Sequence, residues 1–136
     1  MLTNALKKPV FYRCTVCGNL VEMLDSSGMP MMCCGRAMLR LEPNKSEGAG
    51  EKHVPVVTCE DHKVKVEVGA LEHPMTLTHH IEWICLVTKC GIQRRRLEPD
   101  QRPEACFRIK KHDPPLWVLA YCNLHGLWEE SIEDEE

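Results

Sequence analysis

The segment His62-Lys63-Val64-Lys65-Val66-Glu67-Val68 shows the pattern on which most of this chain is built. Its three valines alternate with charged residues, so in an extended strand the valines share one face and Lys63, Lys65 and Glu67 share the other. This period of two is typical of a β-strand that buries one face and exposes the other to water. The segment therefore predicts a half-buried strand.

Similar segments surround this one. Further strand candidates are residues 53–59, 79–88, 91–97, 105–110, 116–122 and 127–132. Turns rich in Pro, Asp and other polar residues separate them, as at 98–103 and 112–115. The sequence contains no convincing amphipathic helix and no internal repeat. About seven short strands with turn signals between them predict an all-β domain, an immunoglobulin-like seven-stranded β-sandwich.

A smaller unit precedes the sandwich. Strand-like residues 10–13 and 20–24 flank Cys14-Thr15-Val16-Cys17-Gly18, and Cys33-Cys34-Gly35 follows after a turn. A unit this short cannot build a sufficient core alone and needs a staple. Residues 42–50 are polar and rich in helix and strand breakers. We therefore expect a small metal-stapled β domain at 1–41, a linker at 42–50 and the sandwich at 51–136.

Composition excludes several classes of partner. The 136 residues carry a formal net charge of −3, and no block rich in Lys and Arg with interleaved aromatics is present, so we expect no nucleic-acid partner. No run approaches the roughly 18 apolar residues of a membrane-spanning helix. The first nine residues lack the apolar core of a secretory signal. We expect a cytoplasmic protein that binds no membrane. In that reducing compartment, nine cysteines indicate metal ligation before disulfides.

The first candidate metal site consists of four cysteines. Cys14-x2-Cys17 and the adjacent pair Cys33-Cys34 are separated by fifteen residues. A tetrahedral four-thiolate site holds zinc or a single iron, and the softness of sulfur does not decide between them. Gly18 and Gly35 each follow a ligand and predict loops whose backbone amides approach the sulfurs. The metal would also be the staple, since its binding energy becomes folding energy. A purely structural zinc site and a disulfide framework are the alternatives, although adjacent cysteines bridge poorly.

The second candidate site lies in the sandwich. Tyr121-Cys122-Asn123-Leu124-His125-Gly126-Leu127-Trp128 holds a thiolate and an imidazole three residues apart, and His53, His73 and His79 precede it in strand-like segments. His53 begins one strand, and His73 and His79 flank a Pro74-Met75 turn, so a loop that enters the 79–88 strand can bring both rings to one centre. Four imidazoles and one thiolate are too many for tetrahedral zinc, so they predict a five-coordinate, redox-active iron with one open position. Imidazoles do not neutralise the charge of the iron, which therefore attracts a small anion. A thiolate pushes electron density toward whatever binds opposite to it.

The remaining histidines and cysteines receive no metal. His62 and His112 lie in polar turn regions, and His80 would point to the opposite face of an extended strand from His79. The default expectation for the four other cysteines is a small buried hydrophobe. These four are Cys59, Cys85, Cys90 and Cys106.

Taken in order, these motifs resemble those of the desulfoferrodoxin family over almost the whole chain. The four-cysteine spacing is similar to desulforedoxin, and the motifs of the second site are similar to the superoxide reductase domain. The resemblance implies two irons per chain. The ligands it implies are Cys14, Cys17, Cys33 and Cys34 for one iron, and His53, His73, His79, His125 and axial Cys122 for the other. It further implies a homodimer that detoxifies superoxide by one-electron reduction to hydrogen peroxide without producing dioxygen, with electrons from rubredoxin or a similar donor.

The resemblance also implies catalytic roles for Glu51 and Lys52. The glutamate can occupy the sixth position of the oxidised iron. The lysine attracts superoxide and helps to organise the water that protonates the product. Physical reasoning agrees about Lys52, because a positive charge in a protein of net negative charge focuses an anionic substrate locally. The alternative interpretation of Lys52 is a solvated lysine with no role in the reaction.

Two other functions compete with the enzyme. One is a rubredoxin-like electron carrier whose second metal site is not catalytic. The other is a zinc-stabilised interaction module. A carrier needs no open, anion-attracting position, and the module leaves the set of four histidines and one cysteine unexplained. The sequence therefore favours superoxide reductase.

Overall fold

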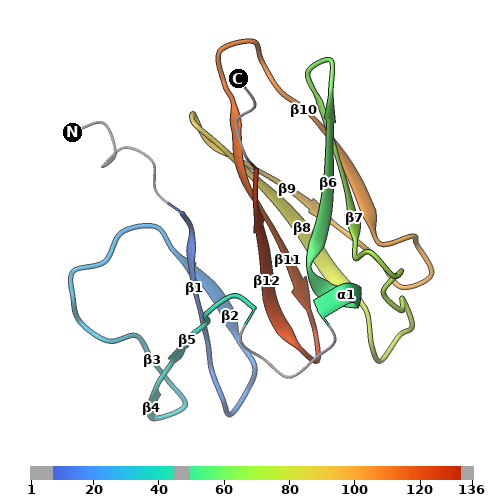
Figure 1. Cartoon of the computed structure of the whole chain (residues 1–136). Helices are drawn as coiled ribbons and strands as arrows, with labels where there is room; N and C mark the ends of the chain where they lie inside the picture. Colours follow the sequence, from blue (N-terminus) through green and yellow to red (C-terminus); the bar gives the residue numbers. More distant parts are fainter. Residues whose placement is uncertain (1–7, 45–49, 133–136) are drawn as a thin grey trace. The chain divides into compact units, whose positions relative to one another are not determined.

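The chain forms two compact units, Met1–Glu42 and Pro43–Glu136. Their structure is a computed structural model that describes residues 8–44 and 50–132, apart from the side chain of Glu51. Both units are built from β-strands (Figure 1), and the described residues contain a single short helix, α1 (Gly50–His53). That helix is far too short to cross a membrane, and the described part of the chain holds no other. The all-β prediction is confirmed.

The first unit is a small sheet with a separate hairpin. Its three antiparallel strands have the order β2-β1-β5, and β3 pairs with β4. The bounds are β1 (Val10–Arg13), β2 (Leu20–Met23), β3 (Met32–Cys33), β4 (Arg36–Ala37) and β5 (Leu39–Arg40). Leu24 and Met29 are largely exposed, as is much of the hairpin, and few side chains of the unit are buried. So little apolar burial fits a unit that needs a staple.

The second unit is a β-sandwich of two antiparallel sheets (Figure 1). One sheet has the order β10-β7-β6 and the other β12-β11-β8-β9. The bounds are β6 (Pro55–Glu60), β7 (Lys63–Val68), β8 (Ile81–Thr88), β9 (Ile92–Arg96), β10 (Glu104–Arg108), β11 (Pro115–Cys122) and β12 (Gly126–Ser131). Seven strands divided three and four give the sandwich that the sequence predicts.

The core of the sandwich follows from the period of two. Val64, Val66 and Val68 of the central strand β7 are at most 1% exposed and belong to one buried cluster. From the facing sheet, alternate residues of β8 and β11 join the same cluster, among them Leu86 and Val118. Each fully buried valine or leucine stabilises the fold by about 1.5–3 kcal/mol relative to an exposed position.

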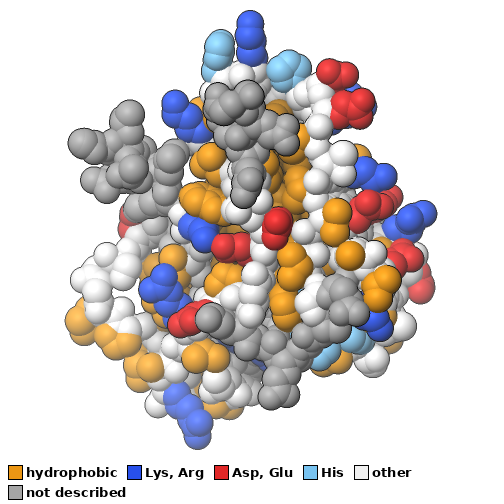
Figure 2. Space-filling view, viewed as in Figure 1, with side chains coloured by type: hydrophobic (Ala, Val, Ile, Leu, Met, Phe, Trp, Pro, Cys, Tyr) orange, Lys and Arg blue, Asp and Glu red, His pale blue; other side chains and the backbone are white. Residues whose placement is uncertain are grey.

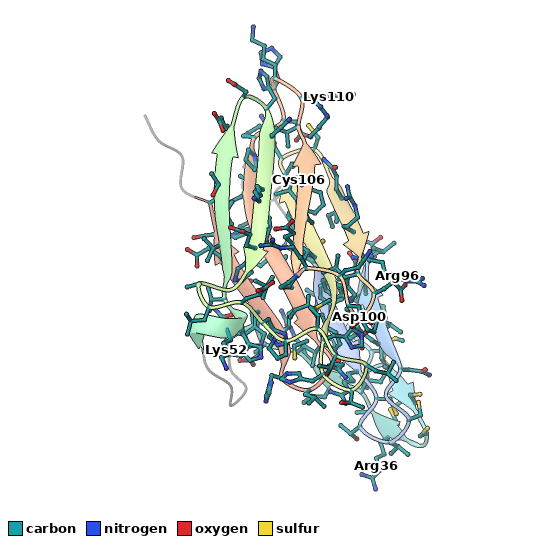
Figure 3. The ribbon with its side chains drawn as sticks, turned by 90° about the vertical axis from the view of Figure 1, so that its right-hand side faces the viewer. Arg36, Lys52, Arg96, Asp100, Cys106 and Lys110 are labelled. Carbon is teal, nitrogen blue, oxygen red and sulfur yellow. The ribbon has the colours of Figure 1, made fainter. Side chains whose placement is uncertain are left out.

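The two long sides of the sandwich differ. On one side, Arg95 and Gln93 of β9 donate to the backbone carbonyls of Cys106 and Arg108 in β10 at 3.1 and 2.8 Å. Figure 3 looks onto this seam. On the other side, a groove of about 1020 Å³ opens between β6 and the strands β11 and β12. Apolar residues such as Val57 and Leu116 line it, and Figure 2 shows hydrophobic side chains gathered on that face.

The four cysteines outside the ligand sets were predicted to be buried, and three of them are exposed. Cys85 is fully buried as expected, but Cys59, Cys90 and Cys106 are exposed. Cys59 lies near the end of an edge strand, and Cys90 lies in the turn between β8 and β9. Cys106 alternates with the buried Ala105 and Phe107 and therefore faces away from the core. For Cys59 and Cys106 the prediction was wrong because it used residue type rather than strand position. The exposure of Cys90 agrees with the turn in which the sequence places it.

Candidate metal centres

The four cysteines of the first unit converge on one point. Their sulfur atoms all lie within 4.8 Å of one another. Cys14 and Cys17 come from the loop after β1, and the tight hairpin between β3 and β4 brings Cys33 and Cys34 to the same place. The sulfurs of Cys17 and Cys33 are 3.7 Å apart. Two thiolates bound about 2.3 Å from a tetrahedral metal would lie about 3.8 Å apart. The spacing therefore fits a tetrahedral ion.

Backbone amides approach the sulfurs, although they are not those of the two glycines. The N–H groups of Val16 and Cys17 donate to Cys14 Sγ, each at 3.4 Å. Gly18 instead supplies backbone conformation, with a φ of +84° and an N–H that donates to the carbonyl of Cys14 at 3.0 Å. Gly35 likewise has a positive φ of +75°. A side chain at either position would be strained.

The electrostatics of the cluster also fit a metal. Hydrogen bonds from the backbone of Cys17 and Val16 lower the pKa of Cys14 to about 6. Hydrogen bonding to Cys17 and Cys14 raises the pKa of Cys34 to about 12, and contact with Cys14 and Cys17 also raises the pKa of Cys33. These opposite shifts mean that the four sulfurs resist ionising together. A bound cation would remove that conflict, because thiolate is the form that ligates.

The five residues of the second site also meet, although they come from three separate segments. His53 ends α1, His73 and His79 lie in the loop between β7 and β8, Cys122 ends β11, and His125 lies in the turn before β12. The loop around Pro74-Met75 is where the sequence places His73 and His79, whereas His53 ends a helix instead of beginning a strand. Such positions at the ends of strands let the three segments converge at one end of the sandwich.

The four imidazoles form a square. Going round the ring in the order His53, His73, His79, His125, the centroids of neighbouring rings are 4.6, 4.7, 5.1 and 4.7 Å apart. The diagonal from His53 to His79 is longer, at 6.4 Å. A tetrahedral set would place all pairs at similar distances. The arrangement therefore differs from a tetrahedral set and fits four ligands placed round a square.

Distances between the nitrogens agree with the square. His53 Nε2 lies 3.1 Å from His73 Nε2 and 3.1 Å from His125 Nδ1. With metal–nitrogen bonds of about 2.1 Å, right angles would give about 3.0 Å between neighbours and tetrahedral angles about 3.4 Å. The observed distances match right angles. His73 thus shares the centre with His53, His79, Cys122 and His125, whose ligand atoms all lie within 4.8 Å of one another.

Cys122 adds a sulfur to the four nitrogens. It is fully buried, and its Sγ lies 3.8 Å from His125 Nδ1. The N–H of His125 donates to that sulfur at 3.4 Å. Burial raises the pKa of the Cys122 thiol. A cation at the centre would compensate that effect and favour the thiolate.

Neighbouring groups orient the imidazoles. His73 Nδ1 donates to the carbonyl of Pro74 at 2.6 Å, which turns Nε2 toward the centre. The ring of His53 stacks on Trp128, with centroids 4.8 Å apart and 25° between the planes. Trp128 Nε1 also donates to the carbonyl of His125 at 3.0 Å. No role for Trp128 was predicted from the sequence, although its position three residues after the ligand His125, at the start of the next strand, was the available signal.

Protonation states in the cluster fit a metal as well. Burial lowers the pKa of His73 to about 4 and also lowers the pKa of His79, so both rings are neutral near pH 7. His79 Nε2 is buried and has no hydrogen-bond partner within the described part of the chain. A neutral imidazole with an unpartnered buried nitrogen is the form that binds a metal. Four imidazoles and one thiolate suit iron and exceed what tetrahedral zinc requires.

The two predicted catalytic residues both lie in α1. Lys52 is exposed, next to His53, and Figure 3 labels it at one end of the sandwich. Its charge contributes to the lowered pKa of His79, after burial and the neighbouring histidines. The side chain of Glu51 lies outside the described residues. Among the described residues, His62, His80 and His112 are outside both ligand clusters.

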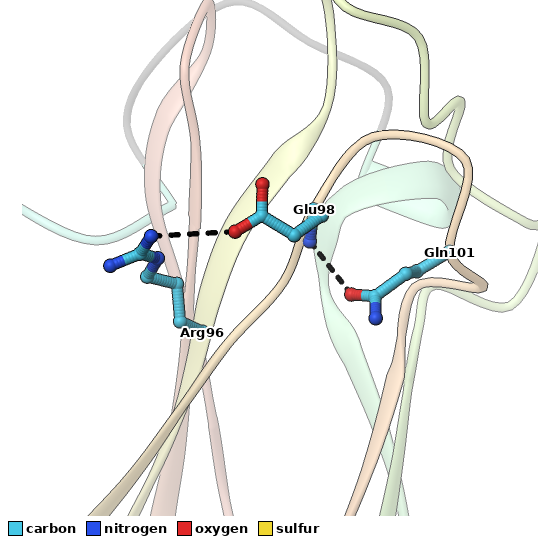
Figure 4. Close-up of polar contacts among 3 residues, drawn as sticks. All are labelled: Arg96, Glu98 and Gln101. Atoms are coloured by element: carbon cyan, nitrogen blue, oxygen red, sulfur yellow. Dashed lines mark hydrogen bonds and ion pairs between the residues drawn. The ribbon is translucent and has the colours of Figure 1, made fainter.

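A braced turn supports the loop that carries His73. The N–H of Asp100 donates to the carbonyl of Met75 at 2.9 Å. Around it, Gln101 Oε1 accepts from the N–H of Glu98 at 2.7 Å, and Arg96 pairs with Glu98 at 3.4 Å (Figure 4). The pair is exposed and contributes little to stability. The backbone contact from Asp100 is what connects this turn to the site.

Comparisons with known proteins agree with the geometry. The family model described as desulfoferrodoxin matches residues 45–131, and the model described as desulfoferrodoxin, N-terminal domain, matches residues 7–41. A desulfoferrodoxin from Syntrophotalea carbinolica is 44% identical over 86% of this chain and 91% of its own length. A superoxide reductase from Pyrococcus abyssi is 36% identical over 72% of this chain and 100% of its own. The crystal structure of the superoxide reductase from Treponema pallidum matches with a TM-score of 0.76 at 35% identity, covering 91% of this chain and 99% of that one.

Proposed function

The chain belongs to the desulfoferrodoxin family, and we propose on that premise that it is a superoxide reductase with two iron centres. The reaction is superoxide plus one electron and two protons giving hydrogen peroxide, without dioxygen. The observation that carries this proposal is the square of four imidazoles with Cys122 beside it. Five donors around an octahedral centre leave one position for the substrate.

The ligand residues prepare a cationic centre. His53, His73, His79 and His125 would hold the iron in a plane with neutral nitrogens, and Cys122 would hold it as thiolate. Iron bound there supplies the electron. Because the five ligands bring only one negative charge, an Fe²⁺ site keeps a net positive charge and attracts an anion. The four-cysteine set would hold the second iron.

Lys52 and Glu51 act outside the ligand set in this proposal. Lys52 adds a positive charge at the end of the sandwich that carries the centre, which raises the encounter rate with superoxide. Its ammonium group also helps to organise the water that delivers a proton to the product. By the family pattern, Glu51 would be a further ligand of the iron in its oxidised state.

The wider setting follows the family as well. We infer a homodimer in the cytoplasm that receives electrons from rubredoxin or a similar small redox protein. Residues 1–41 form the four-cysteine domain, 42–50 the linker and 51–136 the catalytic domain. The alternative is a rubredoxin-like carrier with a second site that is not catalytic. The square arrangement of the imidazoles favours the enzyme, because a closed site without turnover has no use for an unfilled position.

The first experiment is metal analysis and an absorption spectrum of the same freshly prepared sample, before and after oxidation. The proposal expects two irons per chain, an iron–tetrathiolate pattern, and a second thiolate-to-iron band that appears on oxidation. Azide or cyanide should shift the second band, because an open ferric site binds an exogenous anion. Pulse radiolysis should then show superoxide consumed with peroxide formed and no dioxygen. One iron per chain, with zinc or nothing in the histidine site, would leave only the carrier.

A further inference from the structure

Asn123 lies next to Cys122 in the turn between β11 and β12, and its side chain reaches the loop that carries His79. Its Oδ1 accepts a hydrogen bond from the N–H of His80 at 2.9 Å. Its Nδ2 donates to the carbonyl of Thr78 at 2.9 Å, and its backbone N–H donates to the carbonyl of His80 at 3.2 Å. The three bonds therefore bracket His79 from both sides.

Thr76 fixes the same loop in a different way. Its hydroxyl and its backbone carbonyl accept from the N–H of His79 at 3.1 and 3.3 Å. Its N–H and hydroxyl donate back to the carbonyl of His79 at 2.9 and 3.1 Å. These bonds satisfy backbone groups that have no strand or helix partner. They remain within one loop, however, and connect it to no other ligand. That connection comes from Asn123.

We propose that Asn123 is a positioning residue that locks the turn carrying Cys122 and His125 to the loop carrying His79. Three of the five ligands then keep one mutual geometry. The inference rests on the proposed function, because it takes these residues as ligands. Asn123 would thereby fix where the Cys122 sulfur lies relative to the imidazole of His79, which is what a metal held by both residues would sense. Substitution of residues that orient ligands in this way typically lowers metal affinity 10- to 100-fold.

The chemistry of the contact requires an amide. Thr78 offers a carbonyl and His80 offers an N–H, so one side chain must donate and accept at adjacent atoms. Aspartate could accept from His80 but would place a carboxylate oxygen against the carbonyl of Thr78. Alanine would lose both side-chain bonds. Asparagine is therefore the residue that fits both neighbours of His79.

The chain provides a matched control in Asn44. Its Oδ1 accepts from the N–H of Glu129 at 2.8 Å, and its Nδ2 donates to the carbonyl of the same residue at 3.2 Å. Its backbone N–H donates to the carbonyl of Leu127 at 3.0 Å. Asn44 thus makes the same three kinds of bond, but to Leu127 and Glu129, which flank Trp128 in β12, rather than to the neighbours of a ligand. Its φ of +62° makes alanine strained there, so Asn44→Ala should destabilise the fold at least as much as Asn123→Ala.

The test compares Asn123→Ala with Asn44→Ala in the full chain loaded with iron. One measurement is the thermal unfolding of each variant after metal removal. The others are the position of the Cys122 thiolate-to-iron band after oxidation and the resistance of that iron to a chelator. We expect both variants to lose thermal stability. Only Asn123→Ala should shift the band and weaken iron binding by about 10- to 100-fold. Asn123→Asp keeps one of the two side-chain bonds, so its band position and iron affinity should lie between those of the wild type and of Asn123→Ala. It replaces the alanine variant in the test if that variant fails to fold.

The outcomes separate this inference from the proposed function. An unshifted band and unchanged iron affinity in Asn123→Ala, or in the aspartate variant where that one is used, overturn the positioning role. Equal spectral changes in Asn44→Ala overturn it too, because the effect would then be a general loss of stability. Wild-type protein that never shows the thiolate-to-iron band overturns the proposed function itself, and this inference with it.

Discussion

In one candidate metal centre the metal would organise the protein around it, whereas in the other the protein organises the ligands for the metal. The four-cysteine centre lies between short strands in a unit with few buried side chains, and Cys17 and Cys34 are exposed. The five-residue centre lies at one end of a seven-stranded sandwich with a continuous core, where His53, His73 and Cys122 are at most 3% exposed. A metal must hold the first unit together, whereas the second unit can hold its ligands ready. The first centre is suited to stability and the second to chemistry.

Removing metal from both centres gives the strongest test of this difference. A chelator under reducing conditions should unfold the first unit outright, because its binding free energy is its folding free energy. The sandwich should remain folded, since its core does not depend on the metal. Amide hydrogen exchange resolves the two: protection should disappear from β1 and β2 and persist in β7, β8 and β11. Uniform loss of protection would contradict the comparison. Cys106→Ser, which changes an exposed cysteine outside both sites, is the control for thiol chemistry.

Replacing Cys122 by serine tests the same difference from the other side. The serine variant has no thiolate, so the thiolate-to-iron band should disappear. In our proposal it also loses the electron donation on which turnover depends. We expect turnover to fall by at least two orders of magnitude, in line with removal of a principal electrostatic group from an active site. The unfolding free energy should change by only about 1–3 kcal/mol, the cost of a buried hydroxyl with imperfect partners. Denaturant unfolding and pulse radiolysis measure the two quantities. Loss of the sandwich fold would show that this centre, too, organises its unit.

Features that depend on local sequence could be predicted, whereas those that depend on contacts between distant segments could not. The spacing of the cysteines and the presence of five ligands in the sandwich could be read from the sequence, because ligand type and spacing are local information. Strand parity gave the buried valines of β7 and would also have shown that Cys106 points outward, had it been applied there.

Contacts between distant segments could not be predicted in this way. Asn123 bonds to residues 43 and 45 positions away, and the stacking of His53 on Trp128 joins α1 to β12. The square of imidazoles likewise depends on how three segments meet, namely α1, the loop between β7 and β8, and the turn between β11 and β12. No local pattern encodes such a meeting, since it follows from the packing of the two sheets. The sequence therefore identified the ligands, and the structure was needed to find the residues that orient them.

Trp128→Phe is a milder test of the idea that the sandwich holds its ligands in place. Phenylalanine keeps an aromatic face against His53 but loses the N–H that donates to the carbonyl of His125. We expect iron affinity at this centre to fall by about tenfold, while the unfolding free energy drops by about 1 kcal/mol. Chelator competition and denaturant unfolding provide the two numbers. Trp117→Phe, on the same sheet but at the other end of β11, should leave iron affinity unchanged. Equal effects of the two substitutions would argue against a specific role of Trp128.

Lys52→Ala should have the smallest effect, because Lys52 is exposed and acts through water. The charge raises the local concentration of superoxide, so its loss should slow the bimolecular reaction by about tenfold at low salt. The difference should shrink as salt increases, since the Debye length falls from about 30 Å at 0.01 M to about 8 Å at 0.15 M. Lys110→Ala removes the same charge at the opposite end of the sandwich (Figure 3) and should leave the rate nearly unchanged. If both variants slow the reaction equally, net charge rather than position explains the rate. If neither does, the second centre attracts superoxide through the charge of its iron alone.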